Sequence, residues 1–174
     1  MSFKSFLIVA TLFTALPAWC GHGLTQQEQK VLDVWLSKHS AYRAATDADC
    51  DCSDDIQQMK TGYGGNGTPY PDYHPYAVTG DFNNDGATDF AVVVIDRSKS
   101  DKNFTLLIFN GPFRSRPAAP AYIESGLDLR GRGMFFGPPR PKPYRIVVGS
   151  FESDNTWILV PNGHSYKVQV NEGD

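Results

Sequence analysis

The residues best suited to chemistry lie in the stretch DFNNDGATD, residues 81–89. Hard cations such as Ca²⁺ take six to eight oxygen ligands, and a short loop supplies them when oxygens recur at every second residue before a sharp turn. Gly86 is suited to that turn, because glycine tolerates a positive φ. The spacing therefore predicts a calcium site with these ligands: the side chains of Asp81, Asn83, Asp85 and Asp89, and the backbone carbonyl of Ala87.

The flanking sequence excludes one familiar calcium motif and favours another. An EF-hand needs a bidentate Glu at its twelfth position, where this chain has Val92 in an apolar run. Residues 76–96 instead resemble the Asp-x-Asn/Asp-x-Asp-Gly-x-x-Asp loop of FG-GAP and VCBS-type repeats, the calcium loops of integrin-alpha-like β-propellers. The resemblance implies a calcium-bound hairpin between two strands. It does not imply a propeller, which needs four or more blades, because the chain has one such loop and no repeat period.

The alternative is an ordinary polar hairpin loop with an Asp-Gly turn. Such a turn needs only Asp85 and Gly86, and it leaves the other carboxylates of the loop unexplained, since they repel one another without a cation. A second acidic segment, DADCDCSDD, repeats the spacing but has Cys52 where glycine is needed. We interpret that segment as a solvated acidic helix end.

The elements around the loop predict an α+β fold. Thr25 and Glu28 form a capping-box pattern, and an apolar stripe then continues through Tyr42 and Ala45, which makes residues 21–61 a helical segment with a second short helix ending at Gly62. Residues 62–75 are rich in Gly, Pro and Tyr and predict a surface loop. Residues 76–174 contain alternating and apolar strand-like runs. We expect one domain, in which the N-terminal helix packs on an antiparallel sheet of about six strands.

Residues 1–20 have the pattern of a signal peptide. Lys4 precedes the apolar run FLIVATLFTAL, which is too short to span a bilayer comfortably, and cleavage after Ala18 or after Cys20 fits the residues there. The interpretation predicts a periplasmic or secreted protein with no transmembrane segment after signal removal.

The three cysteines, Cys20, Cys50 and Cys52, favour a structural disulfide in an oxidising compartment. If Cys20 leaves with the signal, Cys50 and Cys52 remain as a pair two residues apart. If Cys20 stays, it can join the N-terminus to either of the others, and the sequence leaves the pairing open.

The remaining residues predict binding rather than catalysis. The four histidines are scattered, no serine lies in a nucleophile-elbow pattern, and the net charge of -3 comes with no nucleic-acid motif. We therefore expect a non-enzymatic calcium-binding module for an unknown protein or small ligand, although a metal-dependent hydrolase stays open. The alternative is a periplasmic inhibitor or immunity-type protein for a partner enzyme. The predicted partner contacts are Tyr70, Tyr73, Arg130, Arg132 and Arg140.

Overall fold

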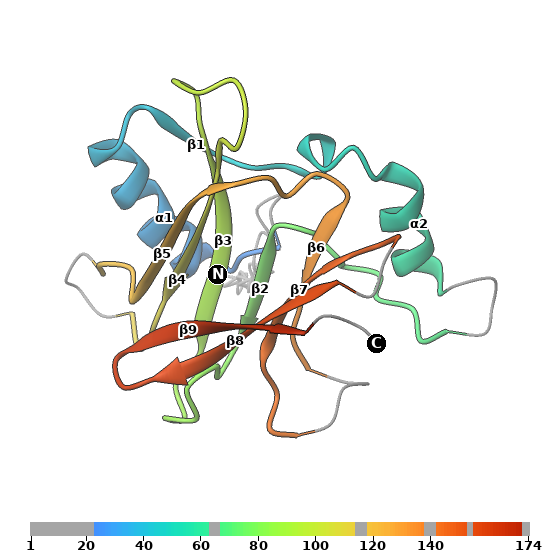
Figure 1. Cartoon of the computed structure of the whole chain (residues 1–174). Helices are drawn as coiled ribbons and strands as arrows, with labels where there is room; N and C mark the ends of the chain where they lie inside the picture. Colours follow the sequence, from blue (N-terminus) through green and yellow to red (C-terminus); the bar gives the residue numbers. More distant parts are fainter. Residues whose placement is uncertain (1–22, 63–66, 114–117, 138–141, 153–154, 172–174) are drawn as a thin grey trace, which may run out of the picture.

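The computed structural model describes residues 23–62, 67–113, 118–137, 142–152 and 155–171. Within them the fold is α+β, with two α-helices, one short 3₁₀ helix and antiparallel strands in two sheets (Figure 1). No helix in these ranges is long and apolar enough to cross a membrane.

Helix α1 begins, and helix α2 ends, where the sequence places a cap. Helix α1 spans Gln26–Lys38, and Thr25 and Glu28 form the predicted capping box at its start. Helix α2 spans Ser53–Thr61 and ends at Gly62, whose φ of 76° suits glycine. Between them, η1 forms a 3₁₀ turn over Asp47–Asp49.

The first sheet is built around its third strand. Its members are β1 (Tyr42–Ala44), β2 (Ala77–Gly80), β3 (Asp89–Asp96), β4 (Phe104–Phe109) and β5 (Tyr122–Leu127). The order is β1-β3-β4-β5, and β2 also pairs with β3. Ala44 lies opposite Val94, whereas Ala77 lies opposite Val92. The two short strands β1 and β2 therefore share one edge of β3, end to end.

The second sheet is a simple meander. It contains β6 (Arg132–Phe135), β7 (Ile146–Ser150), β8 (Thr156–Asn162) and β9 (Ser165–Asn171), in that spatial order. The hairpin from β8 to β9 turns at Asn162 and Ser165, which pair across the turn. This confirms the antiparallel pairing expected for these C-terminal strands.

The two sheets enclose the larger core cluster. The side chains of Ala91, Val93 and Ile95 on β3 belong to the same buried cluster as Met134 on β6 and Val148 on β7. Since successive side chains of a strand point to opposite faces, the odd-numbered residues of β3 face the second sheet. Helix α2 contributes to this cluster through Ile56 and Met59.

Helix α1 covers the other face of the first sheet. Its residues Leu32 and Trp35 lie in a second buried cluster with Phe90, Val92 and Val94, the even-numbered residues of β3. The layers are therefore helix, sheet and sheet, and Figure 1 shows α1 and α2 at opposite ends of the view.

The structure corrects two finer expectations. Residues 21–61 are not wholly helical, because α1 ends at Lys38 and Tyr42–Ala44 form β1, where pairing with β3 outweighs the helical preference of the segment. The described strands number nine in two sheets rather than about six in one, because β1 and β6 are short and carry weak strand signals.

We expect Leu32→Ala to lower the free energy of unfolding by about 2–5 kcal/mol, because it opens a cavity between α1 and β3. Leu32 is 0% exposed, whereas Val34 on the same helix is 41% exposed and serves as the matched control. Urea unfolding measures both variants. A similar loss for Val34→Ala would contradict the assignment of the buried face.

Candidate functional site

The acidic loop connects β2 to β3. Gly80 lies opposite Asp89 in the β2–β3 register, so residues 81–88 close the hairpin. In Figure 1 this loop lies at the lower edge of the molecule, away from both helices. Asn84 and Gly86 have positive φ values of 62° and 83°, which gives the loop its tight curvature.

The side-chain oxygens of the loop fold back over its own backbone. The two carboxylate oxygens of Asp81 accept hydrogen bonds from the N–H groups of Asp85 and Gly86, each at 3.0 Å. The Asn83 side-chain oxygen also accepts from Asp85 N–H at 3.0 Å, and an Asp85 oxygen accepts from Ala87 N–H at 2.8 Å. The predicted ligand residues are therefore gathered into one compact turn.

Asp89 differs from the others because it is fully buried, at 0% exposure. Its carboxylate accepts from the backbone N–H of Phe82 at 2.9 Å and from that of Gly111, after β4, at 2.8 Å. Desolvation raises the pKa of Asp89, the two N–H donors oppose this shift, and the nearby negative charges of Asp81 and Asp85 raise the pKa further.

The loop also influences the second sheet. Desolvation raises the pKa of the Tyr166 hydroxyl on β9, and the carboxylates of Asp89, Asp85 and Asp81 raise it further. That hydroxyl donates to the side-chain oxygen of Asn110 at 2.8 Å. The loop thus lies near β9 of the second sheet.

The calcium site itself stays a prediction. Among the described residues, no group of three or more His, Cys, Asp or Glu side chains has the arrangement of a metal site. The donor set nevertheless suits a hard cation, because it consists of oxygens, and an oxygen that accepts one hydrogen bond keeps a second lone pair.

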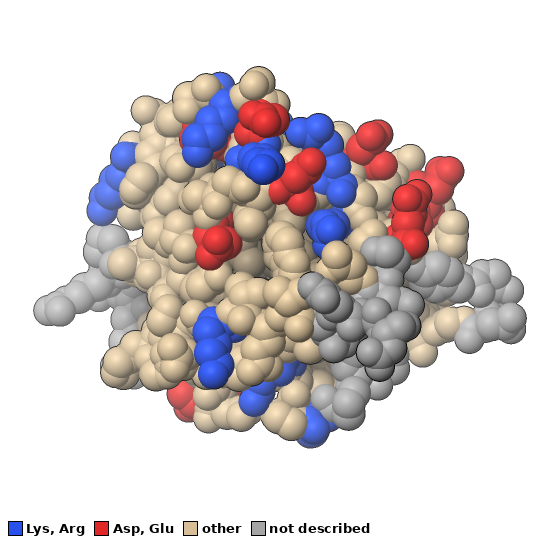
Figure 2. Space-filling model, in the orientation of Figure 1, with Lys and Arg blue, Asp and Glu red and all other residues tan. Residues whose placement is uncertain are grey.

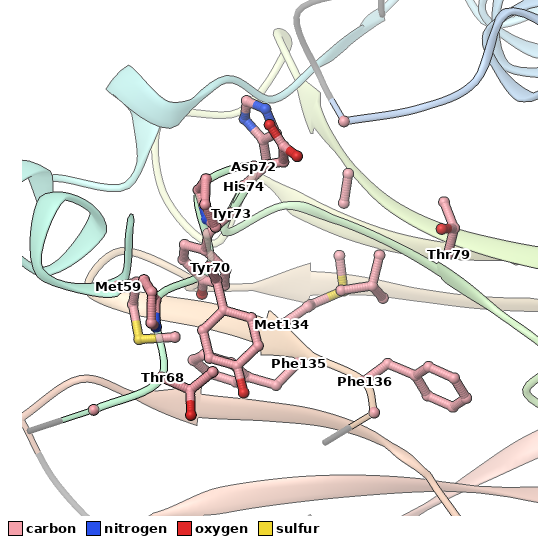
Figure 3. A pocket seen from close by; sticks show the side chains of 17 residues that line it. Met59, Thr68, Tyr70, Asp72, Tyr73, His74, Thr79, Met134, Phe135 and Phe136 are labelled. Atoms are coloured by element: carbon pink, nitrogen blue, oxygen red, sulfur yellow. The ribbon is translucent and has the colours of Figure 1, made fainter. Parts of the chain in front are cut away.

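A pocket of about 700 Å³ lies between α2, the loop at residues 67–74, β2 and the end of β6 (Figure 3). Its walls are mainly apolar and aromatic, and polar side chains stand at its edge. The side chains that define it are Met59, Tyr70, Tyr73, Met134, Phe135 and Phe136 on the apolar side, with Thr68, Asp72, His74 and Thr79.

The aromatic wall is held by contacts on both sides. Tyr73 stacks on Phe135 with ring centroids 5.4 Å apart, and Phe136 packs edge-on against Phe82 at 4.8 Å. Phe136 also covers Gly80, where a Cβ would collide with its ring. Phe136 therefore lines the pocket and also packs against β2, the strand that leads into the acidic loop.

The polar edge includes an oriented histidine. The Nδ1 atom of His74 lies 2.9 Å from an Asp47 carboxylate oxygen, and Lys60 Nζ lies 3.3 Å from the other oxygen. A carboxylate only accepts hydrogen bonds, so His74 Nδ1 donates, and Nε2 is an acceptor in the neutral ring. Asp47 is thus engaged by two partners, whereas Asp51 and Asp54 of the same segment are exposed, as expected for a solvated acidic helix end.

The residues predicted to contact a partner do not form one site, because the tyrosines line the pocket and the described arginines lie outside it. Tyr70 and Tyr73 line the pocket, but Arg130 and Arg132 do not. Arg130 lies near Asp128, with Nε 3.7 Å from a carboxylate oxygen, and Arg132 lies over the Trp157 ring at 5.3 Å. Arg140 lies outside the described residues.

The disulfide joins Cys50 to Cys52, both of them buried, while Cys20 lies outside the described residues. The pair follows η1 and precedes α2, so it constrains the short stretch of chain between the 3₁₀ turn and the helix.

Sequence reasoning missed most of the pocket. Asp47 and His74 are 27 residues apart, and no local pattern joins them. The β6 side of the pocket had one signal in the sequence. Two aromatic residues, Phe135 and Phe136, follow Gly133 closely, and such a run can form the wall of a pocket.

We expect Gly133→Ala to destabilise the protein by about 1–3 kcal/mol, through overpacking beneath the pocket wall. A Cβ there would collide with the Tyr73 hydroxyl and would lie 2.8 Å from the Phe151 ring. Gly149→Ala is the control, because Gly149 lies opposite Gly133 and its closest contact would be 3.2 Å. Thermal unfolding compares the two, and an equal loss would contradict the steric explanation.

The loss of folding stability at low pH should depend on Asp49. The hydrogen bonds from Arg43, at 2.6 and 2.8 Å, are the largest cause that lowers the pKa of Asp49 from 3.8 to about 2, and Thr46 adds to the effect. A lowered pKa in the folded state gives stability that is present above pH ~4 and is lost as the pH falls through ~2. The excess stability over Asp49→Asn, measured by urea unfolding, should therefore shrink between pH 5 and pH 2. A difference in stability between the two proteins that stays constant from pH 5 to pH 2 would contradict this role of Asp49.

Comparisons with models of protein families, with curated proteins and with solved structures give no match to this chain, so the site has to be interpreted from its own geometry.

Proposed function

We propose that this protein is an exported, non-enzymatic binding module whose β2–β3 loop holds a structural calcium ion. The ion would be held by Asp81, Asn83, Asp85, Asp89 and the carbonyl of Ala87. It would supply positive charge at the point where three carboxylates influence one another, and it would hold β2 and β3 in register.

The observation that carries the proposal is the environment of Asp89. The backbone N–H groups of Phe82 and Gly111 offset part of the cost of burying Asp89, but burial and the charges of Asp81 and Asp85 still leave its pKa raised, so its charged form is disfavoured. A divalent ion between these groups would replace the repulsion by attraction, and its free energy of binding would add to the stability of the fold.

Export is supported by the N-terminal pattern and by the disulfide. Disulfides persist in oxidising compartments, and the Cys50–Cys52 bond is buried against the core between the sheets. The inhibitor or immunity-type alternative receives less support, because the predicted arginine contacts do not join the tyrosines in one site.

Calcium should raise the melting temperature of the purified, disulfide-intact protein after chelator treatment. At a concentration of about 100 times Kd the gain is about 2.7 kcal/mol, equivalent to a shift of several degrees. Asp81→Asn and Asp85→Asn should remove most of the shift, because each takes away one negative ligand. Differential scanning calorimetry with magnesium in parallel measures the effect.

The matched control is Asp51→Asn in the second acidic segment, where the φ of 56° is one that asparagine adopts readily. This variant should keep the full calcium shift. A shift that survives in Asp81→Asn and Asp85→Asn, or that Asp51→Asn abolishes, would place the ion elsewhere. The absence of any shift in the unaltered protein would leave the loop as an ordinary hairpin turn.

A further inference from the structure

We propose that the pocket between α2, residues 67–74, β2 and β6 binds a small molecule with a flat apolar body and a positively charged amine at one end. The inference rests on the binding role proposed above, but not on the calcium ion. It assigns a ligand class to a site whose lining residues include none of the predicted calcium ligands.

The size and lining of the pocket fit a small molecule. Its volume of about 700 Å³ lies within the range of 300–1,000 Å³ that is usual for ligand sites. Such sites combine apolar walls with a few polar groups that orient the ligand. Figure 3 shows Met59 and Thr68 at one side of the view, Phe136 and Thr79 at the other, and Asp72 and His74 together above them.

The aromatic side chains favour a flat ligand body. Tyr70, Tyr73, Phe135 and Phe136 all line the same space, and the Tyr73–Phe135 stack keeps two of the rings nearly parallel, at 18°. Aromatic rings bind planar ligands by offset or edge contacts, and their faces attract cations. The thioethers of Met59 and Met134 add adaptable apolar contacts.

The polar edge selects the charge of the ligand. The described residues that line the pocket include Asp72 but no Lys or Arg. Asp72 is exposed at the edge and makes no ion pair with any described residue, so its carboxylate can accept from a ligand. Asp47 accepts from His74 Nδ1, so Nε2 is an acceptor when the ring is neutral.

The exposed Asp72 carboxylate calls for a donor on the ligand, and an ammonium group provides both donors and a complementary charge. Helix α2 has two acids in its first turn, and its one base, Lys60, is paired with Asp47. Figure 2 shows acidic side chains over α2, at the right of the view, and this helix has Asp54 and Asp55 in its first turn and supplies Met59 to the pocket. An acidic surface attracts cationic ligands and repels anionic ones.

The test uses three probes that share one ring system and differ in charge: 2-naphthylmethylamine, 2-naphthylmethanol and 2-naphthoate. Each is titrated into the purified, disulfide-intact protein and followed by amide chemical shifts. We expect the amine to bind most tightly and the carboxylate at least about tenfold more weakly, with the largest shifts at residues 67–79 and 134–137.

Two variants distinguish the effect of the Asp72 charge from the effect of the space inside the pocket. Asp72→Asn should weaken the amine about fivefold and leave the alcohol unchanged, because it removes one exposed charge. Thr79→Trp should reduce binding of all three probes, since Thr79 is exposed and lines the pocket. Val170→Trp on β9 is the control for an added indole, because Val170 is 58% exposed and does not line the pocket.

Equal affinities for the three probes, tighter binding of the carboxylate, or no binding of any of them would overturn the inference. Should Thr79→Trp fail to unfold cooperatively, the Asp72→Asn result alone decides. All titrations are made with calcium and with chelator. If the probes bind but calcium does not raise the melting temperature, the pocket assignment stands and the calcium site is refuted. If calcium raises the melting temperature but no probe binds, the calcium site stands and the pocket assignment is refuted.

Discussion

The burial of β3 on both faces is the constraint that organises this protein. All eight residues of the strand are buried, and its side chains alternate between the cluster under α1 and the cluster between the sheets. A strand in this position is apolar between its ends, because neither face meets water, and its two acids, Asp89 and Asp96, are its first and last residues. The neighbouring strand β4 has the same pattern of complete burial.

The unusual electrostatics of the acidic loop follow from this constraint. Asp89 is the first residue of β3, so its carboxylate enters the protein interior with the strand. It is tolerated there because two backbone N–H groups, from Phe82 and Gly111, donate to it. The two other acids of the loop are less buried, and Asp81 organises the turn by accepting from the N–H groups of Asp85 and Gly86. Asp89 is therefore both the last residue of the acidic motif and the first residue of the buried strand β3.

Local signals in the sequence predicted local structure well. The capping box at Thr25, the end of α2 at Gly62 and the β2–β3 hairpin all depend on neighbouring residues. Tyr42 fits the helical period but belongs to β1; it still packs on Trp35, at 5.3 Å, so the apolar pattern identified the correct cluster in the wrong element. The division into two sheets and the meeting of His74 with Asp47 depend on contacts distant in sequence, which periodicity does not encode.

The shared edge of β3 has a mechanical consequence. The chain leaves the first sheet after β1 and returns to the same edge at β2, so residues 45–76 form an excursion that carries η1, the disulfide, α2 and one wall of the pocket. Pairing between β3 and β4 does not depend on that excursion. Residues Ile56, Met59 and Tyr73 of the excursion nevertheless pack in the same core cluster as β3, so moving the pocket wall would expose core side chains, and the wall is mechanically coupled to the central strand.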